Sequence, residues 1–346
     1  MRLETKEDGD QLIWTLSGSF SFASYNLFGD AISRLPDSPA DKLLVDVAKV
    51  TFVDSAAAWM LLCMAEEADR HGRQFAITGA RGEILQALQL AQQSDLQLSS
   101  DDMGGDGAQD VVMVCEQPPC PQLQENCGRQ GIILAEQGTT EAGSAHLLYG
   151  AASSESIAAG LSKPLAGFVE ACGDHLANLH PRALKAVRRG GFILSLTTRS
   201  ACRIELSLQL EHAILQRFPL GRREGDDMVA LCLAEAISNA VIHGNLDIAS
   251  EMRGSREGFR QFRQIMNDRL ADPVLADRRI TISLSPIKGS SFMVSISDEG
   301  NGFDIARHLG KAIDPAAKFG RGLALIRKVC RNVWAEDDGR TLIMTF

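Results

Sequence analysis

Three short segments in the C-terminal part of the chain constrain its fold most, because each combines polar residues with glycine in a fixed order. They are residues 235–245 (EAISNAVIHGN), 298–302 (DEGNG) and 320–323 (GRGL). A helical apolar pattern runs through the first segment, a short apolar run precedes the second, and a helical pattern follows the third. This order predicts a helix, a strand that ends in a glycine loop, and a helix that begins at a glycine pair.

The first segment carries the polar side chains with the clearest chemistry. Glu235, Asn239 and His243 are spaced four residues apart, so a regular helix places them on one face. The carboxamide oxygen of Asn239 can bind Mg²⁺, a hard cation that takes few protein ligands besides phosphates and water. The carboxylate of Glu235 can accept a proton from an attacking hydroxyl group. By itself, the pattern also fits a helix whose polar face is only solvated.

The two glycine segments can supply the rest of an ATP pocket. Asp298 can accept a hydrogen bond from an exocyclic amine such as that of adenine, and the glycines that follow it let the backbone approach a ring closely. Free N–H groups at the start of the later helix favour phosphate. The residues predicted to contact nucleotide are Asn239, His243, Asp298, Gly300, Gly302, Gly320, Arg321, Gly322 and Leu323.

Together these segments resemble the boxes of the GHKL-type ATP-binding (HATPase) domain, and residues 203–346 look closest to the bacterial anti-sigma-factor serine kinases. Residues 235–245 match the N box, 298–302 the first glycine box and 320–326 the second. The resemblance implies a Bergerat α/β sandwich with ATP and Mg²⁺ as cofactors. The ATP lid that it implies, residues 303–319, is shorter than the lids of sensor histidine kinases.

The resemblance also implies a role for each polar residue. Glu235 would be the catalytic base, Asn239 the Mg²⁺ ligand and Asp298 the adenine anchor. Residues 249–278 depart from the compact kinases, because they are rich in charges of both signs. We expect a solvated helical insertion there, which leaves the docking of partners open.

The first 99 residues alternate strand and helix patterns, as in α/β layer folds. Strands are expected over residues 12–16, 43–47, 50–53 and 75–78, and helices over 55–70 and 84–90. The strand that ends in Asp54-Ser55 and runs into a helix resembles the STAS domain of anti-sigma-factor antagonists. The resemblance implies that Ser55 is the phosphate acceptor, although Ser55 could also simply cap its helix. The usual second serine and glycine are Ala56 and Ala57 here.

Composition limits the classes of function. The chain has 346 residues, 45% hydrophobic and 23% charged, which suits two globular domains and a connector. Its net charge of −9 argues against non-specific nucleic-acid binding, which needs a basic surface. The N-terminus shows no apolar signal segment, and no uninterrupted apolar run is long enough to cross a bilayer. We therefore expect a cytoplasmic protein with no membrane contact.

The expected organisation is a STAS-like domain over residues 1–99, a connector of unknown role over 100–200 and an ATP-binding domain over 201–346. Residues 202–208 alternate like a strand, and helices are expected over 209–218 and 228–242. Three cysteines of the connector, Cys115, Cys120 and Cys127, have spacings that fit no standard zinc pattern. Ordinary buried or loop cysteines are favoured over a metal or redox site there.

We interpret the chain as a bacterial partner-switching regulator of transcription and signal transduction. It would be a protein serine/threonine kinase that phosphorylates a STAS serine, either its own Ser55 or one on another chain. The alternative is a non-catalytic scaffold that binds ATP and partners without phosphotransfer. The implied partners are a sigma factor, a STAS antagonist or a phosphatase, and the sequence leaves the oligomeric state open, a homodimer included.

Overall fold

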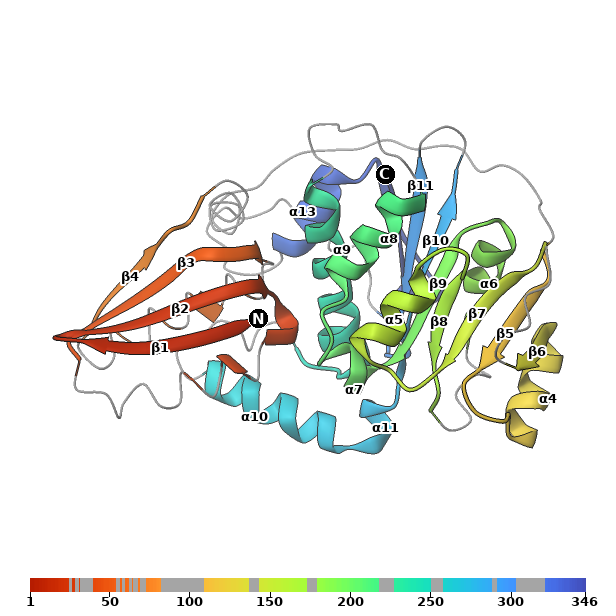
Figure 1. Ribbon diagram of the computed structural model, residues 1–346, viewed down its shortest axis with the longest axis horizontal. Coiled ribbons are helices and arrows are strands. Elements are labelled where there is room, and N and C mark those ends of the chain that lie inside the picture. Colours follow the sequence, from red (N-terminus) through yellow and green to blue (C-terminus); the bar gives the residue numbers. More distant parts are fainter. Residues whose placement is uncertain are drawn as a thin grey trace.

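The computed structural model contains two β-sheets with a layer of helices between them (Figure 1). Helices α8, α9 and α13 lie between the N-terminal sheet and the larger sheet formed by the rest of the chain. The structure describes residues 1–24, 27–28, 31, 40–53, 57, 60–61, 64, 68, 73–81, 109–136, 143–172, 179–217, 227–249, 258–287, 291–302 and 321–346.

The N-terminal sheet has the strand order β1-β2-β3-β4, in which β1 is antiparallel to β2 and the other neighbours are parallel. In β2, Leu12, Trp14 and Leu16 are buried and alternate with more exposed residues, because successive side chains of a strand point to opposite faces. The strands expected over 12–16 and 75–78 are confirmed, and those over 43–47 and 50–53 form one strand. The bounds are β1 Arg2–Asp8, β2 Gln11–Phe20, β3 Lys42–Val53 and β4 Gln74–Thr78.

The helix expected over residues 55–70 is described at five positions only. These positions are helical and buried, as the apolar pattern predicts, and they are Ala57, Met60, Leu61, Met64 and Ala68. They belong to the same hydrophobic core as the inward side chains of the N-terminal sheet. Ser55 and the helix expected over residues 84–90 lie outside the described residues.

The second sheet has nine strands in the order β12-β13-β11-β10-β9-β8-β7-β5-β6. Strands β5 to β9 are parallel to their neighbours in this group, and all pairs from β9/β10 to β13/β12 are antiparallel. The bounds are β5 Val111–Cys115, β6 Ile132–Glu136, β7 Ala145–Gly150, β8 Gly167–Glu170, β9 Phe192–Thr197, β10 Arg279–Pro286, β11 Phe292–Ser297, β12 Asn332–Glu336 and β13 Thr341–Thr345.

Helices cover both faces of this sheet. Helices α5, α8 and α9 lie on the face toward the N-terminal sheet, and α6 packs on β9 and β10 from the opposite face. The helices are α4 Pro121–Gln130, α5 Ser154–Leu161, α6 Pro181–Arg188, α7 Thr198–Ala201, α8 Ser207–Arg217, α9 Asp227–Asn239, the π-helix η4 Ala240–Asn245, α10 Gly258–Ala271, α11 Pro273–Ala276 and α13 Arg321–Val329. The described residues also form two 3-10 turns, η1 Phe22–Ser24 and η6 Asp337–Gly339.

The expectation of a connector over residues 100–200 is wrong for the described part of that segment. Five of the nine strands, β5 to β9, come from residues 111–197, and β9 pairs directly with β10. Strands β5, β8 and β9 are buried at every position. Such strands of a parallel sheet read as short apolar runs without alternation, so periodicity alone does not distinguish them from packed helix segments.

The strand expected over residues 202–208 also needs correction. Residues 202–208 form no strand, because α7 ends at Ala201 and α8 begins at Ser207. The buried Cys202, Leu206 and Leu210 are spaced four residues apart, which is the period of a helical face rather than of a strand. The strand that was expected to end in the glycine loop over residues 298–302 is confirmed, because β11 ends at Ser297.

The charge-rich segment 249–278 is helical where it is described, but it is not simply solvated. Phe262 and Met266 of α10 are almost completely buried and belong to the main hydrophobic core. This core is continuous from the N-terminal sheet through the helical layer to the nine-stranded sheet. In Figure 1, α10 runs below both the N-terminal sheet and α7. It therefore spans the junction between the two parts of the protein.

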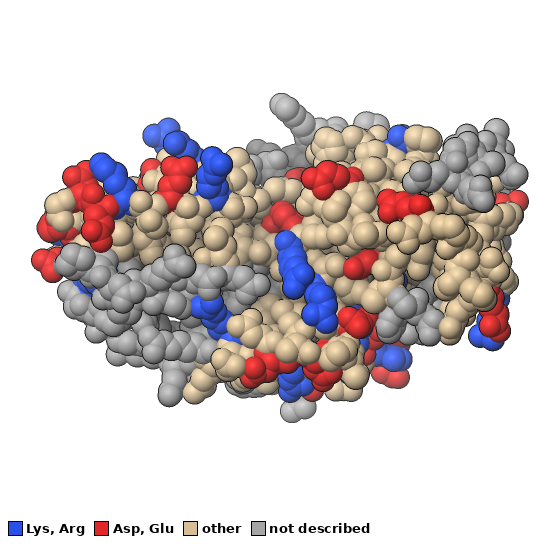
Figure 2. Space-filling view, turned by 60° about the horizontal axis from the view of Figure 1, so that its bottom comes forward, with Lys and Arg blue, Asp and Glu red and all other residues tan. Residues whose placement is uncertain are grey.

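One helical stretch, Met228–Asn245, is long and apolar enough by composition to cross a membrane, among the described residues. Within that stretch 78% is buried inside the protein, as in the central helix of a globular core. On the face drawn in Figure 2, basic and acidic side chains of the described residues are interspersed. Strand β1 contributes charges of both signs at the edge of its sheet, and edge charges oppose pairing with another chain.

Candidate functional site

The helix that carries the first sequence segment faces the start of α13. Glu235 on α9 is 5% exposed, and Asn239 lies half-buried one turn later. A β-carbon at Gly322, the second residue of α13, would lie 2.1 Å from the Glu235 Oε2 atom. The backbone at the start of α13 therefore packs directly on the Glu235 carboxylate, which brings the first and third sequence segments together.

The second segment meets the other end of the same helix. A β-carbon at Gly244 would lie 2.4 Å from the Cγ atom of Asp298. A β-carbon at Gly300 would lie 2.3 Å from the carbonyl oxygen of Gly244. Because contacts this short leave no room for a side chain, glycine at these positions lets the loop after β11 and the end of the helix approach each other. The three segments are contiguous in space.

Asp298 lies at the centre of this contact, immediately after β11. Its Oδ1 atom accepts a hydrogen bond from the Gly300 N–H at 2.9 Å, and its own N–H donates to the Arg340 carbonyl oxygen at 2.9 Å. Burial raises the pKa of the Asp298 carboxyl from 3.8 to about 6, although the Gly300 hydrogen bond and Arg340 oppose the shift. A carboxyl group fixed in this way can accept a hydrogen bond from the amine of a nucleobase such as adenine.

Beyond Asn239 the helix widens into the π-helix η4, so it continues to Asn245, past residue 242 where the sequence predicts its end. The Leu246 N–H donates to the Val241 carbonyl oxygen, five residues back, at 2.9 Å. The wider turn changes the angular spacing, so His243 does not keep the regular helical register that relates it to Glu235. Its Nδ1 atom lies 2.6 Å from the Ile248 carbonyl oxygen, which is a contact within the protein rather than with a ligand.

Asn245 also belongs to this site, although its place in the sequence predicted no role for its side chain. It is fully buried, and its Nδ2 group donates to the Thr198 hydroxyl at 2.9 Å and to the Arg279 carbonyl oxygen at 3.0 Å. Its Oδ1 atom accepts from the Glu299 N–H at 2.7 Å. One carboxamide thus joins α7, β10 and the Asp298 loop. Its place directly after Gly244, at the end of the first sequence segment, was the available signal.

Several predicted contact residues are only partly described. Gly302 has a left-handed backbone, with φ of 74°, and a β-carbon there would lie 2.1 Å from the Asp338 carbonyl oxygen. Leu323 is half-buried on α13. Gly320, the Arg321 side chain and the predicted lid over residues 303–319 lie outside the described residues.

The donor set suits Mg²⁺ better than a metal held entirely by protein. Among the residues that the structure describes, no group of three or more His, Cys, Asp or Glu side chains could hold a metal ion. Mg²⁺ needs no such group, because it commonly binds one or two protein oxygens together with phosphates and water. The half-buried Asn239 carboxamide, one turn from Glu235, fits that requirement.

Comparison with protein families agrees with this geometry. A family described as the histidine kinase-like ATPase domain matches residues 206–346, and one described as the Mlab, STAS domain matches residues 3–98. The chain joins a STAS domain to a histidine-kinase-like ATPase domain. This pairing fits a partner-switching regulator, since STAS domains are components that bind protein partners.

Individual relatives resemble the STAS domain. A STAS-domain containing protein of Pseudomonas aeruginosa (strain UCBPP-PA14) is 29% identical over 84 residues, which are 24% of this chain and 82% of that protein. The anti-sigma factor antagonist SpoIIAA in its unphosphorylated form matches with 11% identity and a TM-score of 0.23, over 26% of this chain and 83% of that one. The STAS domain of an antisigma-factor antagonist from Rhodobacter sphaeroides matches with 18% identity and a TM-score of 0.20. This match covers 22% of this chain and 85% of that one.

The STAS domain packs against the ATPase domain next to Glu235. Phe52, near the end of β3, forms a buried cluster with Ala230 and Ala234 of α9. The Ser21 hydroxyl of the STAS domain donates a hydrogen bond to the Glu205 carboxylate, which also accepts from a second serine, Ser207, at 2.5 Å. Burial raises the pKa of Glu205, and the Ser207 hydrogen bond partly opposes this shift. The two domains therefore share a contact with apolar and polar parts.

Two of the three cysteines that cluster in the sequence are buried thiols in the structure, and the third, Cys120, is exposed. Cys115 and Cys127 are buried, and burial raises the pKa of Cys127 to about 12. Cys120 caps helix α4, where its Sγ atom accepts from the Leu123 N–H at 3.4 Å. A thiol with a raised pKa is a poor nucleophile and a poor metal ligand. Burial therefore favours a packing role for Cys115 and Cys127, and Cys120 acts as a helix cap.

Proposed function

We propose that this protein is an ATP-dependent serine kinase of a partner-switching system, and that its substrate is a serine on a STAS domain. The observation that carries the proposal is the position of Glu235, a buried carboxylate on α9 against which the glycine-bearing start of α13 packs. A protein that only binds nucleotide needs groups for the base and the metal but no buried carboxylate there. A kinase needs that carboxylate as a base.

The nucleotide would lie along α9, with its base at one end and its phosphates at the other. Asp298 would accept a hydrogen bond from the adenine amine beside Gly244 and Gly300. The start of α13, near Gly322, would offer backbone N–H groups to the phosphates, which helix N-termini favour. Mg²⁺ held by Asn239 would supply positive charge to the phosphates when bound.

The proposed reaction transfers the γ-phosphoryl group to a serine hydroxyl. The serine Oγ atom attacks the γ-phosphorus, the bond from this phosphorus to the oxygen that bridges the β- and γ-phosphates breaks, and ADP leaves. Glu235 accepts the proton of the serine hydroxyl. The product serine carries close to two negative charges near neutral pH, enough to change which protein surface binds the STAS domain.

We propose Ser55 as the acceptor, within the same chain. Phe52 is anchored on Ala230 and Ala234, and Ala234 is the sequence neighbour of Glu235. Three residues of chain separate Phe52 from Ser55, a length that spans at most about 11 Å. Attachment in one chain also gives the acceptor a high effective concentration, commonly in the millimolar range for short links. The proposal places the protein in the cytoplasm with a sigma factor, antagonist or phosphatase as partner.

The test is incubation of the purified full-length chain with Mg²⁺ and ATP, followed by phosphosite mapping. We expect phosphate on Ser55, no phosphate in Asn239→Ala, and retained ATP binding without transfer in Glu235→Gln. Mixing the Glu235→Gln chain with a Ser55→Ala chain distinguishes transfer within one chain from transfer between chains. In this mixture the chain that carries Ser55 lacks the base, so phosphate on Ser55 can come only from the other chain.

Two outcomes would contradict parts of the proposal. Efficient transfer in the mixed sample would show that the chains phosphorylate one another. ATP binding without serine phosphorylation, on this chain or on an added STAS domain, would exclude the kinase and support a nucleotide-binding scaffold.

A further inference from the structure

Residues 109–201, here called the middle module, form an α/β unit that neither domain family covers. Their strands have the order β6-β5-β7-β8-β9, in which the second strand lies outside the first and the remaining strands follow on the other side. This is one of the two common doubly wound orders of parallel sheets. Because β9 pairs antiparallel with β10, the module shares one continuous sheet with the ATPase domain.

The carboxyl end of β8 connects to the nucleotide site through buried and partly buried hydrogen bonds. The Glu170 carboxylate accepts from the Thr197 N–H and from the Ser200 hydroxyl, both at 2.6 Å, and so fixes the turn into α7. The next residue of that turn, Thr198, accepts from Asn245 at 2.9 Å. Asn245 in turn holds the N–H of Glu299, the neighbour of Asp298.

A buried arginine reinforces this first connection. Arg279 is 2% exposed, and its guanidinium donates to the carbonyl oxygens of Glu170 and Ser195 in the middle module. Its backbone N–H donates to the Glu299 carboxylate at 2.9 Å. Burying a guanidinium is costly unless its donors are satisfied, so this position depends on the acceptors that β8 and β9 provide.

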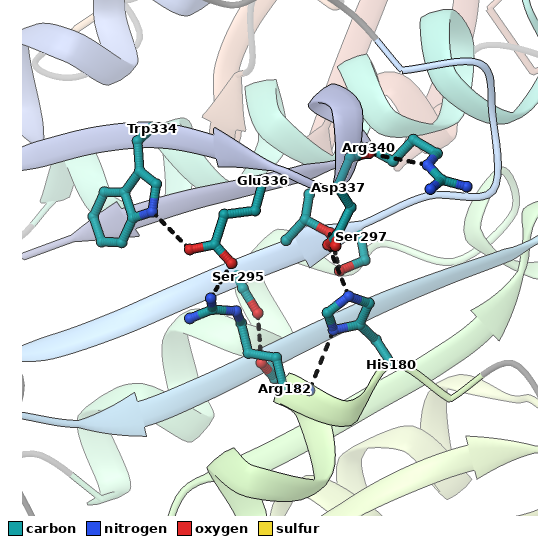
Figure 3. Close-up of polar contacts among 10 residues, drawn as sticks. His180, Arg182, Ser295, Ser297, Trp334, Glu336, Asp337 and Arg340 are labelled. Carbon is teal, nitrogen blue, oxygen red and sulfur yellow. Dashed lines mark hydrogen bonds and ion pairs between the residues drawn. The ribbon is translucent and has the colours of Figure 1, made fainter.

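A second connection leaves helix α6 of the middle module on the opposite face of the sheet (Figure 3). His180 Nε2 lies 2.8 Å from the Asp337 Oδ2 atom, and Arg182 forms an ion pair with Glu336. The Glu336 carboxylate also accepts from the Trp334 indole N–H at 3.0 Å. Two side chains from one end of α6 thus hold the end of β12 and the η6 turn.

The η6 turn and the neighbouring Arg340 contact residues 298–302, here called the adenine loop. Arg340 donates through Nε to the Asp337 carbonyl oxygen at 3.0 Å, and its own carbonyl oxygen accepts the Asp298 N–H at 2.9 Å. The Asp338 carbonyl oxygen lies against the Cα of Gly302, where a β-carbon would be 2.1 Å away. Both connections from the middle module therefore end at the same five-residue loop.

We infer that the middle module positions the adenine loop and thereby sets the nucleotide affinity of the ATPase domain, with His180, Arg182 and Arg279 as positioning residues. The inference rests on the proposed nucleotide site, but it requires no phosphotransfer. Binding free energies of coupled sites are reciprocal, so nucleotide in the site must also stabilise the end of α6 that holds η6. That reciprocity distinguishes coupling from a merely structural contact.

The first test measures ADP affinity of the full-length chain by calorimetry in the presence of Mg²⁺. His180→Ala with Arg182→Gln is the test variant, because both side chains are partly exposed and their replacement leaves the core intact. We expect ADP to bind at least about 5-fold more weakly, the lower end of typical coupling. The matched control is Arg129→Gln, which removes an exposed ion pair with Glu125 in the same module, far from the loop in sequence and on another helix.

The second test is amide hydrogen exchange over α6, with and without ADP. We expect ADP to slow amide hydrogen exchange in residues 181–188 of the wild-type chain and of the Arg129→Gln control. In the His180→Ala, Arg182→Gln double variant, ADP should not change this exchange. The inference would be overturned if the double variant bound ADP with unchanged affinity and ADP did not alter hydrogen exchange in α6 of the wild-type chain. A lower melting temperature of the variant would not rescue the inference. ADP binding without serine phosphorylation would overturn the kinase proposal and leave this one standing, whereas no ADP binding would overturn both.

Discussion

Gly244 packs its Cα against the carboxylate of Asp298 so closely that a β-carbon at position 244 would lie 2.4 Å from the Asp298 Cγ atom. We therefore expect Gly244→Ala to push the adenine loop away and to destabilise the fold by about 1–3 kcal/mol, the usual cost of overpacking. Nucleotide affinity should fall with it. Chemical denaturation and calorimetric titration with ADP measure the two effects.

The control for this substitution is Gly128→Ala in α4. Position 128 is helical, and a β-carbon there would have no neighbour within 4 Å. Alanine should be neutral or slightly stabilising at that site, because it favours helix more than glycine does by about 1 kcal/mol. Equal losses in the two variants would show that the contact with Asp298 is unimportant.

Nucleotide binding should depend on pH through Asp298. Burial raises the pKa of its carboxyl from 3.8 to about 6, and only the ionised form is a full acceptor for the adenine amine. If Asp298 controls binding, the affinity for ADP should rise by about tenfold between pH 5 and pH 7. Titrations at several pH values check this, and Asp298→Asn should bind weakly with the pH dependence removed.

The stability of the unliganded protein should also depend on the ionisation of Asp298. The contribution of Asp298 to stability should fall as the pH rises, whereas the affinity for ADP should increase. A carboxyl whose pKa is raised by folding binds protons more tightly when folded, so its contribution is fully present below 3.8 and is lost as the pH rises through about 6. The difference in unfolding free energy between the wild type and Asp298→Asn should change over that interval. A difference that is constant from pH 4 to pH 7 would show that the pKa of Asp298 is not raised.

Removal of the Asn245 side chain should be more damaging than its size suggests. The Asn245→Ala variant removes the side-chain hydrogen-bond partner of the half-buried Glu299 N–H and of the buried Arg279 carbonyl oxygen. Loss of a buried hydrogen-bond partner costs about 1–3 kcal/mol for each group left unsatisfied. We expect a large fall in the unfolding free energy by denaturant titration. Asn245→Asp should also destabilise, because a carboxylate cannot donate to either Thr198 or Arg279.

The contact between the domains should control transfer without affecting nucleotide binding. Phe52→Ala removes the aromatic ring that packs on Ala230 and Ala234, and a buried Phe→Ala change costs about 3–5 kcal/mol in a core. We expect slower phosphorylation of Ser55 and fewer cross-links between the domains, at unchanged ADP affinity. Phe75→Ala, a ring on β4 outside this cluster, is the matched control, and equal effects of the two changes would argue against docking through Phe52.

The two domain assignments could be predicted from local sequence, because each depends on residues close together in the chain. The pattern around Glu235 and Asn239 requires only one helix, and the glycines that follow Asp298 require only one strand and a loop. The STAS strands were predictable for the same reason, since one face of β2 is buried and the other is not. Such alternation is visible without knowledge of the partner strands.

The middle module could not be predicted in this way. Three of its strands, β5, β8 and β9, are buried at every position, so they lack alternation, and their neighbours in the sheet come from other parts of the chain. The helical face around Cys202 and Leu206 was mistaken for a strand because a few apolar residues fit either period over a short stretch. The role of Asn245 depends on Thr198 and Glu299, which lie more than forty residues away on either side.

The sequence by itself determined which chemical groups this protein has and which local elements carry them: Glu235 and Asn239 on one helix, Asp298 after a strand, and a glycine pair at a helix start. Only the tertiary structure decided that Gly244 and Gly322 bring these elements into contact and that α6 holds the turn behind Asp298. The physical reason is that local propensity and periodicity act over one or two turns of chain. Close packing and buried hydrogen bonds instead join residues that are distant in the chain, and they depend on how the whole core is filled.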